Sequence, residues 1–168
     1  NVKEEDVTKE QRFVGKSTIL GAGYGMGAVR FAEQLRTFGT TISEDEARRI
    51  IQINRDTNWK IAHFWRACQN MLVEMSRNNL CSFGTNNIVK VVHTQTALTG
   101  YGIKLPSGLV MRYDDLQYEQ GQRGVEFSYM TRRGRTRIYG GKVTENVCQA
   151  IARCIMGEQM LAIAKRYK

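Results

Sequence analysis

The chain has 168 residues, of which 42% are hydrophobic and 24% charged, and its formal net charge is +9. This length suits one domain or a large piece of one. The basic excess indicates a polyanionic partner, unless the protein is simply soluble and basic. No apolar run approaches the roughly 20 residues of a membrane span, and no CxxC pair supports a zinc ribbon.

Two helical segments separated by glycines are expected near the start of the chain. The first covers about 12–20, and residues 6–8 can cap it. Glycines then stand at every second position across 21–27, where they weaken or bend a helix. The helical pattern resumes through 28–35 and ends at Gly39.

Two further helices are expected before residue 76. Ser43 and Glu46 have the spacing of a capping box, which predicts a helix beginning there. A longer helix is predicted over about 58–75. Its apolar stripe comprises Ile61, Trp65, Cys68, Leu72 and Met75. Residues 76–98 show no dominant period, so no element is assigned to them.

The last part of the chain predicts two hairpins and a helix. Strands over 103–105 and 109–113 flank a Pro-Ser-Gly turn. A second pair over 125–130 and 136–139 flanks a basic turn. The closing helix covers about 144–165. Its expected buried side comprises Val147, Ile151, Cys154, Ile155 and Leu161. Mostly helix with short antiparallel hairpins predicts an α+β fold.

The alternating glycines are not a dinucleotide-binding fingerprint. That fingerprint needs glycine at its first, third and sixth positions after a strand, and counting from Gly21 the sixth position is Met26. Acidic residues about 20 positions later, over 44–46, open a helix instead of ending a strand. A Rossmann domain is therefore disfavoured.

Tyr113, Asp114 and Asp115 are similar to the paired aspartates of some polymerase metal sites. The reverse-transcriptase form has one residue between the tyrosine and the acids, and here there is none. Two acids at a strand end favour a turn. His63 and His93 lack spaced partners, so no metal site is predicted in this chain.

Four residues at intervals of four can form a nucleotide-binding stripe. Arg12, Lys16, Leu20 and Tyr24 each advance by about 40° around a helix. Two cations could hold a triphosphate, the leucine could press on a sugar, and the tyrosine could meet a base. The alternative is an amphipathic surface helix with solvated cations.

This spacing resembles motif B of family A DNA polymerases, the DNA polymerase I type. The resemblance covers nearly the whole chain in the right order and is specific to bacteriophage members. Besides the stripe, it includes residues 7–12 before the helix, Tyr24-Gly25-Met26 after it, the helices within 42–65, the Leu-Pro-Ser-Gly turn at 105–108 and the segment 139–153. It implies a mostly helical fingers subdomain over 1–98. Residues 99–168 would form hairpins and part of the palm, ending before motif C.

The resemblance implies a role for each position of the stripe. Arg12 and Lys16 would bind the phosphates of the incoming deoxynucleoside triphosphate, and Lys16 would also assist proton transfer to the leaving pyrophosphate. Leu20 would pack on the sugar, where the family usually carries Phe or Tyr and some phage members carry Leu. Tyr24 would lie beside the nascent base pair.

The resemblance also implies contacts with primer-template DNA. Gln149, together with Asn146, would contact the minor groove near the primer end. The motif assigns no role to four arginines of the second hairpin. They are interpreted either as contacts to the phosphate backbone or as a solvated charged turn. They are Arg132, Arg133, Arg135 and Arg137.

The carboxylates of motifs A and C, which hold magnesium in this family, are missing from the sequence. Two-metal phosphoryl transfer needs both, so this chain alone is expected to be inactive. We expect part of a complete or split polymerase whose remainder supplies these motifs, acting in the cytoplasm of an infected bacterium without a membrane partner. The alternative is a non-catalytic DNA-binding module.

Overall fold

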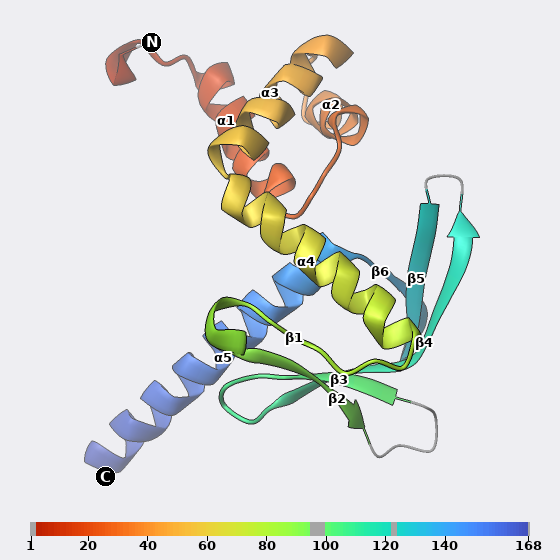
Figure 1. Cartoon of the computed structure of the whole chain (residues 1–168). Coiled ribbons are helices and arrows are strands. Elements are labelled where there is room, and N and C mark those ends of the chain that lie inside the picture. The colour runs from red at the N-terminus through yellow and green to blue at the C-terminus, as the bar shows by residue number, and fades with distance from the viewer. Residues whose placement is uncertain (1–2, 95–99, 122–123, 168) are drawn as a thin grey trace. The chain divides into compact units, whose positions relative to one another are not determined.

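The computed structural model describes residues 3–94, 100–121 and 124–167, which divide between two compact units, 1–63 and 64–168. Helices and an antiparallel sheet make up most of the described residues, which confirms the α+β class (Figure 1). The functional division expected at 98/99 falls on residues outside the described ones and stays a prediction.

Capped helices build the first unit. A short 3-10 turn, η1 (Glu4–Asp6), precedes α1 (Lys9–Ala22), α2 (Ala28–Thr37) and α3 (Glu44–Thr57). Thr8 begins α1 with a reciprocal capping box, in which the Thr8 hydroxyl accepts from the Gln11 N–H and the Gln11 side chain accepts from the Thr8 N–H. Polar caps therefore set where α1 starts.

The predicted capping box at the start of α3 is only half present. The Ser43 hydroxyl accepts a hydrogen bond from the Glu46 N–H, 3.1 Å away, as the sequence indicated. The Glu46 carboxylate makes no reciprocal bond to Ser43 among the bonds of the described residues. One orphan N–H of the helix start is thus satisfied by the serine alone.

The glycine-rich segment separates α1 from α2. Gly25 has φ +84° and Gly39, just after α2, has φ +85°, a left-handed conformation in which glycine carries no Cβ penalty. The three helices then bury a shared core. It comprises Ala22, Phe31, Ala32, Leu35, Ala47 and Ile51.

A six-stranded antiparallel meander forms the second unit, in the order β1-β2-β3-β4-β5-β6. The strands are β1 (Ser82–Phe83), β2 (Val89–Thr94), β3 (Gly100–Lys104), β4 (Val110–Gly121), β5 (Gly124–Thr131) and β6 (Gly134–Ile138). Both expected hairpins are present, β3 with β4 and β5 with β6, and the pairings of β2 with β3 and of β4 with β5 join them into one sheet. The turn η2 (Thr85–Asn87) and strands β1 and β2 lie where no element was assigned.

One face of this sheet packs against α4 (Trp59–Ser76) and α5 (Gly140–Arg166). Alternate strand residues point into this core, as a period of two requires. The sheet contributes Val89, Val91, Ile103, Tyr113, Phe127 and Ile138, and the helices contribute Cys68, Met71, Leu72, Met75, Val143 and Val147.

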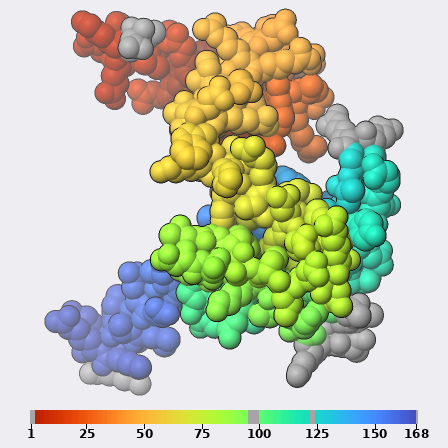
Figure 2. Space-filling model, viewed as in Figure 1, coloured from red at the N-terminus to blue at the C-terminus, as the bar shows by residue number. Residues whose placement is uncertain are grey.

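The outer half of α5 was expected to be buried on one side, but its apolar side chains are exposed. Ile155 is 51% exposed and Leu161 is 63% exposed, because the core ends near Ile151. The turn with Ser107 and Leu109 lies beside the later turns of α5 without burying these two side chains, and Figure 2 shows the C-terminal end of the helix at the surface. By length and composition alone α5 could cross a membrane, and 6% of its most apolar window is buried among the described residues, but one such helix is weak evidence of a membrane span.

Candidate nucleic-acid interface

The predicted nucleotide-binding stripe lies on the exposed side of α1. The buried residues of α1 are Ser17, Thr18, Gly21 and Ala22. Arg12 and Lys16 are exposed, Leu20 is 60% exposed, and neither cation pairs with a carboxylate in the described part of the chain. These three side chains therefore remain available to a ligand.

Tyr24 continues the stripe beyond the end of the helix. Its N–H donates to the Gly21 carbonyl, 3.3 Å away, and its side chain is 42% exposed. Four residues rise about 6 Å along a helix, so Arg12, Lys16 and Leu20 follow one another along α1, whereas Tyr24 lies after its last residue, Ala22.

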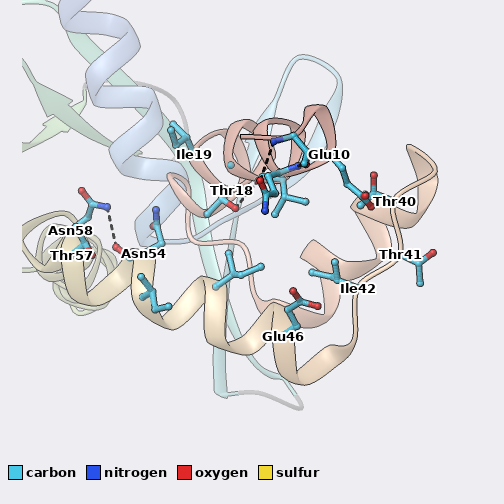
Figure 3. A pocket seen from close by; sticks show the side chains of 16 residues that line it. Glu10, Thr18, Ile19, Thr40, Thr41, Ile42, Glu46, Asn54, Thr57 and Asn58 are labelled. Atoms are coloured by element: carbon cyan, nitrogen blue, oxygen red, sulfur yellow. Dashed lines mark hydrogen bonds between the residues drawn. The ribbon is translucent and has the colours of Figure 1, made fainter. Parts of the chain in front are cut away.

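A groove of about 890 Å³ lies between α1 and α3, beside the stripe but without any of its residues (Figure 3). Apolar side chains such as Val14, Ile19 and Ile50 line it together with several threonines. Its charged lining residues are Glu10 and Glu46, both acidic. Phosphate groups are therefore not favoured there.

The predicted minor-groove contacts lie in a second groove, within the second unit. Asn146 and Gln149 line a groove of about 920 Å³ that we call the α5 groove. The turn between β3 and β4 supplies Ser107 and Leu109 to the same groove. The Ser107 hydroxyl and the Cys154 thiol share a hydrogen bond at 3.2 Å. The structure thus brings together two segments that the sequence analysis singled out separately.

Each amide of the α5 groove donates to an acceptor that does not line the groove. Asn146 Nδ2 donates to Tyr113 Oη at 3.2 Å, and Gln149 Nε2 donates to Glu145 Oε1 at 3.1 Å. Lys142 Nζ donates to the other Glu145 oxygen at 2.6 Å. This bond raises the pKa of the Lys142 ammonium, because it favours the charged form.

Sequence reasoning missed Tyr113, Glu145 and Lys142 as partners of these amides. The i, i+4 spacing of Glu145 and Gln149 could have indicated their bond. The Tyr113 contact could not be found locally, because it joins a strand and a helix 33 residues apart.

Comparison with curated proteins finds similarity to the DNA polymerase of Bacillus phage SP02. The two chains are 31% identical over 166 residues, which cover 90% of this chain and 24% of the relative. This chain is related to a phage DNA polymerase. It spans about a quarter of that polymerase's length. No protein-family model matches the chain, and no solved structure matches it.

The four arginines of this polymerase-related chain divide into two pairs. Arg132 and Arg133 are exposed in the turn between β5 and β6, without a carboxylate partner among the described residues. Arg135 is ion-paired with Asp115, and Arg137 Nη2 lies 3.1 Å from Glu126 Oε2. The turn arginines are therefore better placed for phosphate contacts than the strand arginines.

The adjacent aspartates lie within β4, where the pairing with β5 has an irregularity, so the expected turn was wrong. Asp115 has φ +49°, and Asp114 is bound to Arg112 as Asp115 is to Arg135. In the described residues no three His, Cys, Asp or Glu side chains gather into a possible metal site.

Proposed function

We propose that this chain is part of a template-directed DNA polymerase of family A that replicates phage DNA. In this proposal it binds the incoming deoxynucleoside triphosphate and primer-template DNA. The observation that carries the proposal is the stripe of exposed side chains along α1, with the two cations first and the leucine next, in a chain related to a phage DNA polymerase. Residues 1–98 would serve as the fingers, and residues 99–168 as hairpins and part of the palm.

In the proposed nucleotide complex, Arg12 and Lys16 bind the triphosphate through charge-assisted hydrogen bonds. Lys16 also supplies a proton toward the leaving pyrophosphate, since an ammonium group on an exposed helix face can reach a phosphate oxygen. Leu20 packs on the sugar, and Tyr24 lies against the nascent base pair. The absence of internal ion pairs at both cations supports this assignment within the described residues.

In the proposed DNA complex, the Asn146 and Gln149 amides contact the minor groove near the primer end. Every base pair offers acceptors there at purine N3 and pyrimidine O2, so an amide donor can bind without reading sequence. Arg132 and Arg133 contact phosphates of the backbone. The net charge of +9 supports a polyanionic partner of this kind.

The remainder of the polymerase would supply the carboxylates that bind magnesium, and this chain alone would not incorporate nucleotides. The relative is about four times longer than the segment matched here, which leaves ample polypeptide for this role. The same polypeptide would cover the exposed outer half of α5. The assembly would act in the cytoplasm of an infected bacterium.

The proposal is tested with the purified chain, a labelled primer-template and a labelled deoxynucleoside triphosphate. We expect DNA binding by fluorescence anisotropy, a nucleotide complex that Arg12→Ala weakens, and no primer extension. Arg30→Ala, which removes an exposed arginine of α2, is the matched control. A nucleotide complex insensitive to Arg12→Ala, or an absence of DNA binding, would contradict the proposal.

One subunit of a split polymerase and a non-catalytic DNA-binding module are the alternatives. The intact mass of the natural protein separates them from a longer polymerase, because either alternative predicts a mass near that of 168 residues. A neighbouring reading frame that encodes the missing carboxylates would then favour the split polymerase.

A further inference from the structure

The two amides of the α5 groove are held by residues behind it. Tyr113 accepts from Asn146, and Glu145 accepts from Gln149, while neither acceptor lines the groove. We infer that Tyr113 and Glu145 are positioning residues, which orient the two amides for the DNA minor groove before DNA arrives. This inference rests on the proposed function of Asn146 and Gln149.

The contact with Glu145 fixes which way round the Gln149 amide lies. An ionised carboxylate only accepts hydrogen bonds, so the amide must turn its NH₂ group toward Glu145 and its carbonyl oxygen away. Glu145 is itself held, because Lys142 binds its second oxygen. The three side chains lie at i, i+3 and i+7 along α5, on neighbouring turns of one face.

The contact with Tyr113 holds the Asn146 side chain in place, but a neutral phenol both donates and accepts, so it does not select which end of the amide faces it. Tyr113 is 2% exposed, and its ring packs edge-to-face against Tyr129 with the centroids 5.0 Å apart. A hydroxyl on so confined a ring has little freedom to move. Burial raises the pKa of Tyr113 to about 12, so the phenol stays neutral throughout the physiological range.

An amide held in advance loses less conformational entropy when it binds DNA. Each amide still has a second N–H donor and its carbonyl oxygen after the bond to its positioning residue. Loss of Tyr113 Oη or of the Glu145 carboxylate should therefore weaken DNA binding without removing a contacting group.

Whether Glu145→Ala weakens or strengthens DNA binding distinguishes a positioning role of Glu145 from a simple effect of net charge. Removing one carboxylate raises the formal charge from +9 to +10. Counterion release alone would then strengthen DNA binding. A weaker complex thus points to loss of the amide's orientation. Glu74→Ala is the control, because Glu74 binds Arg77 and Asn79 as Glu145 binds Lys142 and Gln149.

The test measures the affinity of the full chain for a fluorescent primer-template at fixed salt. Asn146→Ala and Gln149→Ala should weaken it, and Tyr113→Phe and Glu145→Ala should each weaken it by roughly three- to tenfold. Tyr101→Phe, which removes another tyrosine hydroxyl bonded to an asparagine, should have no effect. Glu145→Gln, which keeps an acceptor oxygen, should recover part of the loss.

A double-mutant cycle decides between positioning and a structural defect. If Tyr113 acts through Asn146, adding Tyr113→Phe to Asn146→Ala should cause no further loss, and likewise for Glu145→Ala with Gln149→Ala. Additive losses, or single variants with unchanged affinity, would overturn the inference while leaving the DNA site intact. If neither amide variant changes affinity, the proposed DNA site itself fails.

Discussion

The backbone N–H of Gly140 donates a hydrogen bond to Gln69 Oε1, 2.8 Å away, where the first turn of α5 meets α4. The side chain of Gln69 therefore satisfies an N–H of the α5 start, where Tyr139 offers no side-chain cap. Glycine permits this approach, since a Cβ at position 140 would lie 2.0 Å from the Trp65 carbonyl oxygen.

Gly140→Ala should accordingly destabilise the second unit. Backbone cannot yield as a flexible side chain can, so we expect a loss of at least about 2 kcal/mol in the free energy of unfolding. Gly157→Ala is the control in the same helix, since its Cβ meets nothing within 4 Å. It should be neutral or stabilising by up to about 1 kcal/mol. Urea unfolding of both variants measures the difference, and equal stabilities would contradict the close approach.

Arg12→Ala and Lys16→Ala, made in the complete polymerase, should each reduce nucleotide incorporation by at least about tenfold. Each removes a charge-assisted bond to phosphate worth on the order of 1.5–3 kcal/mol. Single-turnover kinetics measures the effect, with Arg30→Ala as the control for loss of an exposed helical cation. Near-parental kinetics for both stripe variants would remove the motif B assignment.

DNA binding should weaken steeply as salt increases, with the turn between β5 and β6 contributing to the slope. The double variant Arg132→Ala/Arg133→Ala should reduce the slope of log affinity against log salt by about two, because two phosphate contacts are lost. Arg30→Ala/Arg36→Ala removes the same charge from the exposed side of α2. An equal change for both pairs would mean that net charge alone is responsible.

Local sequence signals predicted the helices well because helix starts and ends depend on neighbouring residues. Thr8 and Ser43 cap their helices through hydrogen bonds to residues three positions on. Left-handed Gly39 follows the end of α2 for the same local reason.

Local sequence signals could not predict contacts between segments that are distant in the sequence. Strands β1 and β2 were not predicted, because each has only a short apolar alternation and a turn with left-handed Asn86 and Asn87 separates them. The period of α5 identified an apolar face but not whether anything covers it, so Ile155 and Leu161 were wrongly expected to be buried. The bond from Asn146 to Tyr113 likewise depends on how β4 and α5 pack.

Leu20 leads to a prediction about how the polymerase discriminates between the sugars of incoming nucleotides. The family resemblance implies that an aromatic residue usually faces this sugar, and that a tyrosine there tolerates a missing 3′-hydroxyl because its own hydroxyl replaces the lost partner. Leu20 has no hydroxyl and less surface than a ring. The complete polymerase should therefore discriminate strongly against dideoxynucleotides and incorporate normal nucleotides more slowly than an aromatic variant.

Leu20→Tyr should relax this discrimination by more than about tenfold, which corresponds to about 1.4 kcal/mol in relative barrier. Single-turnover incorporation of matched deoxy and dideoxy substrates measures the ratio. Ile19→Tyr is the control, because Ile19 is also exposed on α1 but lines the groove toward α3. If the Leu20→Tyr ratio equals that of the parent, Leu20 does not face the sugar. If Ile19→Tyr changes the ratio instead, the nucleotide lies on the α3 side of the helix, and the register of the stripe is wrong.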